Sequence, residues 1–210
     1  RDIARKVRNG EYTYRDCAIL YRTNAQSRLF EERFIAGNIP YKIVGGVNFY
    51  ARKEIKDVLR YLQTIDNGQD DLAVRRIINV PKRGIGATTI SRVAAYAGEQ
   101  EMSFYRALRM AGDIPGIGKA ETKIRPFVLF IQSMRAKAEV LSVSELLSEV
   151  IETTGYVAEL KAEGTEEAEA RIENIDELIS KAVDYEQGEE HPTLSGFLEE
   201  VALVADIDSL

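Results

Sequence analysis

Val80-Pro81-Lys82-Arg83-Gly84-Ile85-Gly86-Ala87-Thr88-Thr89 is the segment around which the rest of this chain is arranged. Pro81 ends the helical pattern before it, and the two glycines permit a tight bend or a close approach to another backbone. Apolar residues recur at helical spacing from Ile90 onward, so Thr88 or Thr89 is expected to cap a helix that begins there. The segment predicts a turn followed by a helix N-terminus.

The same segment is a candidate site for an anion. Free backbone amides at a helix N-terminus, beside the cations Lys82 and Arg83, suit a phosphate oxygen. The pattern resembles half of a helix–hairpin–helix, a module that holds the DNA backbone without reading bases. The alternative is a short connection between two helices, which uses the same glycines. A second turn, Pro115-Gly116-Ile117-Gly118-Lys119, repeats the pattern before a basic helix and favours DNA contact.

Composition predicts an ordinary globular chain. Of its 210 residues, 45% are hydrophobic and 30% are charged, and the length suffices for one large domain or two small ones. No apolar run has the length that a bilayer requires. The single cysteine, Cys17, excludes an internal disulfide framework and suits a reducing compartment. We therefore expect a cytoplasmic protein that has no membrane partner.

Charge is distributed unevenly along the chain. Residues 1–144 carry 25 Lys and Arg against 15 Asp and Glu, whereas residues 145–210 carry 3 against 19. A basic part joined to an acidic part indicates a polyanionic partner. The alternative for the acidic part is a solvated helical surface that keeps the protein soluble.

Catalytic and metal-binding patterns are not found in the sequence. One histidine, His191, and one cysteine cannot build a zinc site. The phosphate-loop pattern and the Gly-x-Ser-x-Gly nucleophile pattern are both missing. The many carboxylates lie on periodic helical segments. We therefore expect no catalytic residue, no metal and no cofactor in this chain.

Hydrophobic periodicity divides the chain into two regions. The apolar runs Cys17–Tyr21 and Tyr41–Val44 are expected to be buried strands flanking a helix, which makes the first region an α/β fragment. The second region shows helical periodicity only and is expected to be an all-α domain, so the chain is mostly helical overall. Its helices are expected at 72–79, 87–99, 103–111, 118–140, 144–154, 156–163, 166–186 and 194–206.

Four segments carry a resemblance to a known family. In chain order they are Tyr21–Arg28, Gly45–Asp57, Asn79–Gly86 and Arg171–Leu178, and they resemble motifs of superfamily 1 DNA helicases of the UvrD, Rep and PcrA kind. Their order and spacing agree over essentially the whole chain. The family implies that the complete protein is a helicase that moves 3′ to 5′ and uses ATP and Mg²⁺, although this chain lacks the phosphate loop.

The resemblance also implies a division of the chain into subdomains. Residues 1–68 correspond to part of a RecA-like motor subdomain called 2A. Residues 69–206 correspond to a helical subdomain called 2B, with hairpin-like turns at 80–89 and 115–119. Residues 207–210 correspond to a truncated return to 2A.

Site residues follow from the resemblance, position by position. Single-stranded DNA is expected at Arg22, Asn24 and Arg28. Asn24 has the alternative role of an N-cap, and Arg28 that of an ion pair with Glu31 or Glu32 on the helix surface. Duplex DNA is expected to be clamped without base specificity by Lys82, Arg83, Gly84, Ile85, Gly86, Thr88 and Thr89, with Gly116, Gly118 and Lys119 as secondary contacts.

Two further expectations concern charged residues. Reversing the charges of Lys82 and Arg83 together is expected to weaken duplex binding without changing thermal stability. The charged residues at the start of the next helical pattern are expected to form mostly an exposed face: Arg52, Lys53, Glu54, Lys56 and Asp57.

The sequence thus predicts the DNA-binding and regulatory region of a helicase. Its expected partners are duplex and single-stranded DNA, the remaining helicase subdomains, and repair or replication proteins. The alternative is a protein-interaction or autoinhibitory module, with the acidic helices of residues 145–200 as its docking face.

Overall fold

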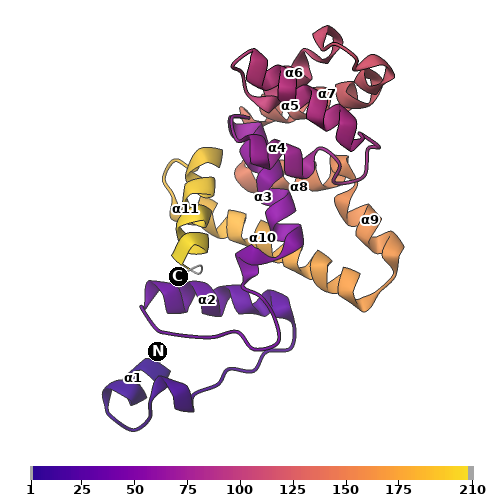
Figure 1. The fold of residues 1–210 in the computed structure, drawn as a ribbon. Coiled ribbons are helices and arrows are strands. Elements are labelled where there is room, and N and C mark those ends of the chain that lie inside the picture. The colour runs from indigo at the N-terminus through magenta and orange to yellow at the C-terminus, as the bar shows by residue number, and fades with distance from the viewer. Residues whose placement is uncertain (1, 208–210) are drawn as a thin grey trace.

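The computed structural model describes residues 2–207, and every regular element in that range is helical (Figure 1). The α-helices are α1 Asp2–Arg8, α2 Ser27–Ala36, α3 Lys53–Asp66, α4 Asp71–Ile77, α5 Ala87–Glu99, α6 Phe104–Arg109, α7 Glu121–Ala138, α8 Val143–Thr154, α9 Tyr156–Glu163, α10 Glu166–Gly188 and α11 Leu194–Ile207. Short 3₁₀ turns are η1 Tyr14–Asp16, η2 Asn24–Gln26, η3 Phe49–Ala51, η4 Ala111–Asp113 and η5 Gly118–Ala120. The prediction of a mostly helical chain is confirmed.

Helix α3 lies at the centre of the helical body (Figure 1). Its apolar residues Ile55, Val58, Leu62 and Ile65 recur on one face and are almost fully buried. The helix packs against α4, α7, α8, α10 and α11. Burying each such side chain contributes about 1.5–3 kcal/mol. Helix α3 is therefore a main source of the stability that holds the helices of the chain together.

The helix ends follow from local capping chemistry. The Asp70 carboxylate accepts from the backbone N–H of Leu72 at 2.9 Å and of Ala73 at 3.0 Å, which fixes the start of α4. Helix α5 begins differently from the expectation, because Gly86 is its N-cap and no side chain caps it. Thr88 and Thr89 lie inside its first turn, so the expectation that one of them caps the helix is wrong.

The two expected strands are not found in residues 2–207. Cys17–Tyr21 and Tyr41–Val44 form no β-ladder, and Leu20 and Val44 are 95% and 87% exposed. An open cavity of about 880 Å³ lies between these segments and α2. An apolar run predicts an extended backbone, but a strand also requires a neighbour with which to exchange hydrogen bonds. The prediction of an α/β part is therefore wrong for this structure.

Two remaining expectations concern the end of the chain and membranes. The predicted return to subdomain 2A covers residues 207–210, and residues 208–210 lie outside the described residues. Among the helices of residues 2–207, none combines the length and the apolarity that crossing a membrane demands.

Candidate nucleic-acid interface

Asn79 closes the turn that connects α4 to α5. Its side-chain amide donates to the carbonyl of Ile85 at 2.6 Å and accepts from the N–H of the same residue at 3.1 Å. The Ile85 side chain is consequently held in the core, where it is 4% exposed. The glycines on either side of Ile85 are exposed at the surface. The predicted tight turn is present, with Ile85 as its anchor rather than as a surface contact.

Arg83 points into the protein. Its guanidinium donates to the carbonyls of Ile77 and Ile78 at 3.0 and 3.2 Å, and to the hydroxyl of Tyr61 at 2.6 Å. Its Cζ also lies 5.2 Å from the centre of the Phe127 ring. The side chain thereby satisfies carbonyls that the end of α4 leaves without helical partners. The expectation that reversing this charge leaves stability unchanged is not compatible with these contacts.

Lys82, the neighbour of Arg83, behaves in the opposite way. Its side chain is exposed and makes no ion pair or hydrogen bond with any residue in the range 2–207. The two cations that the sequence presents together are therefore separated by the fold. One holds the turn and the other faces solvent.

The two glycine turns brace each other. The Lys123 ammonium, on the helix after the second turn, donates to the carbonyl of Gly84 at 3.0 Å. The Arg92 guanidinium, on the helix after the first turn, donates to the carbonyl of Gly116. The backbone of Gly84 has φ +68° and that of Gly116 has φ +76°, a region that side chains disfavour. The expected repetition of the turn is thus also a direct contact between the two copies.

Positive charge and free backbone donors are present around the paired turns. Helix α5 begins without a side-chain cap, so its first-turn N–H groups and its dipole face outward. Helix α7, in contrast, continues directly from η5, and the N–H of Glu121 is bonded within that turn. Lys82, before α5, and Lys119, in η5, are exposed, as is Thr88. Such an arrangement suits phosphate oxygens. Of the predicted duplex residues, Gly84, Gly86, Gly116 and Gly118 are exposed too, whereas Thr89 is half-buried.

The three residues predicted for single-stranded DNA are not equivalent. Arg22 and Asn24 are exposed, and the cap before η2 is Thr23 rather than Asn24. Arg28, in contrast, is 2% exposed. Arg22 and Asn24 therefore lie at the surface, whereas Arg28 is turned away from solvent.

Arg28 joins α2 to α10 through carboxylates. Its guanidinium contacts Glu32 on its own helix at 3.3 Å, and Glu177 and Asp184 on α10 at 2.7 and 3.1 Å. Glu177 and Asp184 are seven residues apart and so lie on one face of α10. Burial acts to lower the pKa of Arg28, but the hydrogen bond to Glu177 and the charge of Glu32 outweigh it and raise the pKa. The alternative ion pair with Glu32 is confirmed, as part of a larger cluster.

A buried polar cluster at the start of α3 was missed by sequence reasoning. Arg52 donates to the side chains of Asn174 and Ser27, each at 2.7 Å, and Asn174 donates to Glu54 at 2.6 Å. All four residues are less than 9% exposed. Burial lowers the pKa of Arg52. The four residues belong to three of the four segments that resemble the helicase family, but the sequence alone does not show that those segments meet.

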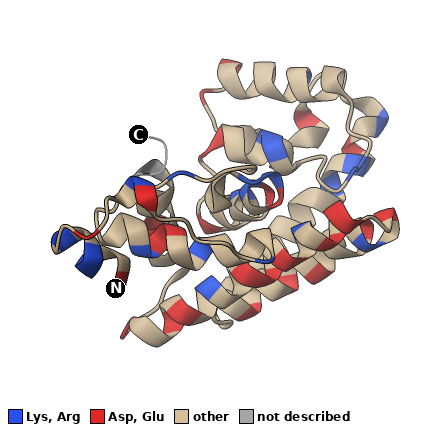
Figure 2. Cartoon of the chain, turned by 90° about the horizontal axis from the view of Figure 1, so that it is seen from below, with Lys and Arg blue, Asp and Glu red and all other residues tan. Residues whose placement is uncertain are grey.

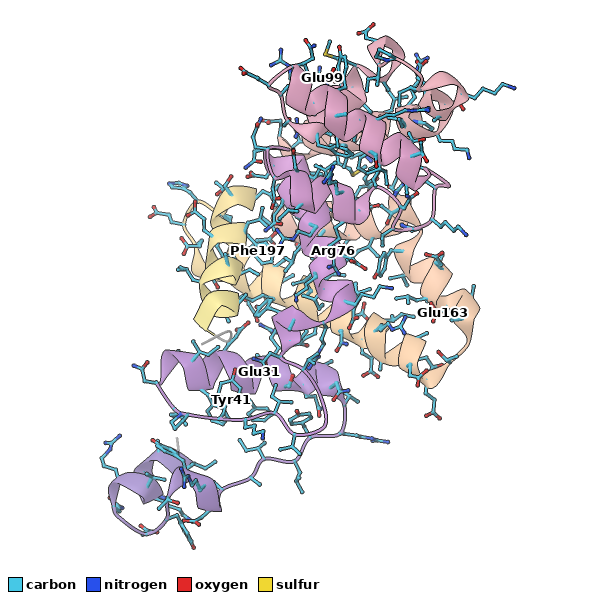
Figure 3. The ribbon with its side chains drawn as sticks, viewed as in Figure 1. Glu31, Tyr41, Arg76, Glu99, Glu163 and Phe197 are labelled. Atoms are coloured by element: carbon cyan, nitrogen blue, oxygen red, sulfur yellow. The ribbon has the colours of Figure 1, made fainter. Side chains whose placement is uncertain are left out.

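Asp57 is buried as well. It accepts a hydrogen bond at 2.7 Å from Arg76, labelled in Figure 3, and another at 2.9 Å from the hydroxyl of Tyr156. Arg52, Glu54 and Asp57 therefore contradict the expectation of an exposed charged face. Only Lys53 and Lys56 fulfil it. These carboxylates and amides tie α3 to α4, α9 and α10.

Helix α10 is rich in acidic residues (Figure 2), and some of them make internal contacts. Glu177 and Asp184 hold Arg28, and Glu186 accepts from the backbone N–H and the hydroxyl of Ser144 at 2.6 and 2.9 Å. Its remaining carboxylates are Glu166, Glu167, Glu169, Glu173 and Asp176. The alternative of a solvated acidic surface fits this second group, whereas the first group also has structural contacts.

A family model and individual relatives both match nearly the whole chain. Residues 1–209 match the family described as UvrD-like helicase C-terminal domain. The chain is 45% identical over 201 residues to the ATP-dependent DNA helicase PcrA of Bacillus subtilis strain 168, covering 96% of this chain and 27% of that protein. It is 46% identical over 211 aligned positions to PcrA of Staphylococcus aureus strain Mu50, covering 99% and 29% respectively.

The chain therefore spans less than a third of the length of these relatives. The family match, in contrast, extends over nearly every residue. The chain belongs to the family of UvrD-like helicase C-terminal domains.

Proposed function

We propose that this chain is the DNA-binding and regulatory region of a 3′–5′ ATP-dependent DNA helicase. Residues 1–68 belong in this proposal with motor subdomain 2A, and residues 69–206 form subdomain 2B. The chain contains no phosphate-loop sequence, so ATP and Mg²⁺ are assigned to the remainder of the helicase and not to this part. Relatives named as ATP-dependent DNA helicases support the assignment of the parent activity.

The observation that carries the proposal is the mutual bracing of the two glycine turns. The uncapped N-terminus of α5, together with the exposed Lys82 and Lys119, supplies outward-facing donors on the two turns. Contact with phosphates through amides and ammonium groups requires no particular base, which suits an enzyme that unwinds any sequence. In this proposal the duplex ahead of the fork lies against the paired turns.

In this proposal each candidate site residue has its own role. Lys82, Lys119, Thr88 and the exposed glycines contact the duplex backbone, while Arg83 and Ile85 hold the turn in shape. Arg22 and Asn24 contact single-stranded DNA, with Arg22 on phosphate. Arg28 positions helix α2 without touching DNA, because its guanidinium is already surrounded by three carboxylates.

Charge reversal at both turns tests the duplex contact. The double variant Lys82→Glu, Lys119→Glu is expected to bind a short DNA duplex roughly tenfold or more weakly, and to lower the salt dependence of binding by about one ion per lost phosphate contact. Lys161→Glu on α9 is the matched control, because that lysine is also exposed and makes no ion pair within residues 2–207. Equal duplex binding by the two variants at low salt contradicts the assignment.

The rival function is a protein-docking face formed by the acidic helices. Glu177, Asp184 and Glu186 make internal contacts, which leaves a smaller free acidic surface on α10 than the sequence suggests. Charge reversal of Glu167 and Glu169, which face solvent, separates the two functions. Duplex binding is unaffected if the paired turns hold the DNA, whereas capture of a protein partner is reduced if the acidic face docks it.

A further inference from the structure

A groove of about 640 Å³ lies between helices α6 and α7, apart from the interface described above. Its volume is in the range of ordinary ligand sites, about 300–1,000 Å³. Its polar lining residues are Arg106, Arg109, Arg125 and Gln132. Its apolar lining residues are Met110, Val128 and Leu129. No aromatic and no acidic residue is among them.

The charges of the three arginines are not neutralised by a carboxylate within residues 2–207. Their side chains form no hydrogen bond and no ion pair with any residue from 2 to 207, and all three are exposed. Helix α6 buries Phe104, Tyr105, Ala107 and Leu108, which directs Arg106 and Arg109 outward. These positions contribute no ion pair to the fold. Three like charges around one groove raise its positive electrostatic potential.

Leu129 is the exposed apolar residue of the lining. Arg125, Leu129 and Gln132 recur at the spacing of one helical face of α7. Leu129 is 55% exposed although its neighbours Phe127 and Val128 are buried. Arginine and methionine around an apolar floor are typical of protein-binding surfaces, where a buried apolar anchor is surrounded by charge-assisted contacts.

We propose that this groove binds an acidic peptide segment that places an apolar side chain on Leu129. Carboxylates of the segment form paired hydrogen bonds with the guanidinium groups of Arg106, Arg109 and Arg125. The partner is a protein with such a segment. DNA is the less suitable occupant, because no aromatic residue in the lining offers a base a stacking surface.

The test uses short fluorescent probes and anisotropy at physiological ionic strength. One peptide alternates glutamate and leucine, a second replaces each leucine with serine, and a third probe is a single-stranded oligothymidine. The glutamate–leucine peptide is expected to bind most tightly, by roughly tenfold over the glutamate–serine peptide. Arg109→Glu combined with Arg125→Glu, and separately Leu129→Ser, are each expected to remove most of that binding.

Matched controls keep structural damage separate from loss of the site. Arg33→Glu lies on exposed helix surface at α2, and Leu72→Ser replaces a leucine that is 75% exposed on α4. Both are expected to bind the glutamate–leucine peptide as the unchanged protein does. All variants replace exposed side chains, and their thermal unfolding is measured beside the binding.

Three outcomes overturn the proposal. The first is equal binding of the two peptides, which removes the role of the apolar floor. The second is a loss of oligothymidine binding in the arginine variant while peptide binding is kept, which makes the groove a nucleic-acid site. The third is self-association that the groove variants abolish, which makes a second copy of the chain the occupant. Selective loss of glutamate–leucine peptide binding in the groove variants supports the proposal. This result does not depend on the outcome for duplex binding at the glycine turns.

Discussion

Arg83 donates a hydrogen bond of 2.6 Å to the hydroxyl of Tyr61, and that hydroxyl donates in turn to the carbonyl of Val80. Tyr61 lies on α3, the central helix, and is 1% exposed. Burial raises its pKa, and the adjacent Arg83 charge opposes that rise. The proposed DNA-binding turn is therefore fastened to α3, the central helix of the fold.

The separation of Lys82 from Arg83 leads to the first prediction. Lys82→Glu is expected to leave the midpoint of thermal unfolding unchanged, because no contact is lost. Arg83→Gln is expected to lower the free energy of unfolding by about 1–3 kcal/mol, because it removes hydrogen bonds from a charged donor to buried groups. Urea denaturation of both single variants measures this difference, and equal stability of the two contradicts it.

Gly84 and Gly116 provide a second prediction. An alanine Cβ at these positions would lie 3.3 Å from the Lys123 ammonium and 3.4 Å from the Arg92 guanidinium carbon, on a left-handed backbone. Each substitution to alanine is expected to cost about 1–2 kcal/mol. Gly86→Ala is the matched control, since its backbone φ is −72° and no atom lies within 4 Å of the added Cβ. Thermal unfolding of the three variants tests the ranking.

The success of sequence reasoning depended on how local the signal was. Helices α5 to α11 begin and end near the expected residues, because a cap such as Ser103 and a 3.6-residue apolar period lie within one short segment. The strands failed at Leu20 and Val44, since apolar character there says nothing about a pairing neighbour. Local signals specified the helices, and non-local pairing remained open.

The candidate site shows the same division. The sequence identifies both glycine turns, but the direction of Arg83 depends on Tyr61, which is 22 residues away. Arg28 depends in the same way on Glu177, which is 149 residues away. A single sequence contains no information on such pairs until the fold has brought them together. The sequence alone therefore could not show that the Lys82 side chain is exposed and the Arg28 side chain is buried.

Arg28 gives the third prediction. Arg28→Met leaves Glu32, Glu177 and Asp184 close together without their shared cation. The expected loss is about 2–3 kcal/mol, below the range for fully buried pairs because these carboxylates remain partly solvated. Arg33→Met on the same helix is the control. A stability loss without any change in single-stranded DNA affinity supports the positioning role, and the reverse result contradicts it.

The hydrogen bond from Tyr156 to Asp57 leads to the last prediction, on pH dependence. Burial, followed by the Asp57 charge and the hydrogen bond to it, raises the pKa of Tyr156 above its ordinary value. The unfolded chain loses this proton near pH ~10, whereas the folded chain keeps it. Stability from this residue is therefore complete below about pH 10 and declines as the pH rises further.

Tyr156→Phe tests this directly. At neutral pH the variant is expected to be less stable by about 1–2 kcal/mol, because Asp57, which is 1% exposed, keeps only its contact with Arg76. Above pH ~10 its free energy of unfolding is expected to fall less steeply than that of the unchanged protein. Tyr12→Phe, at a side chain that is 50% exposed, controls for removal of a hydroxyl. Parallel pH profiles for the unchanged protein and Tyr156→Phe contradict the prediction, since the two must converge at high pH if the Tyr156 proton is held by the fold.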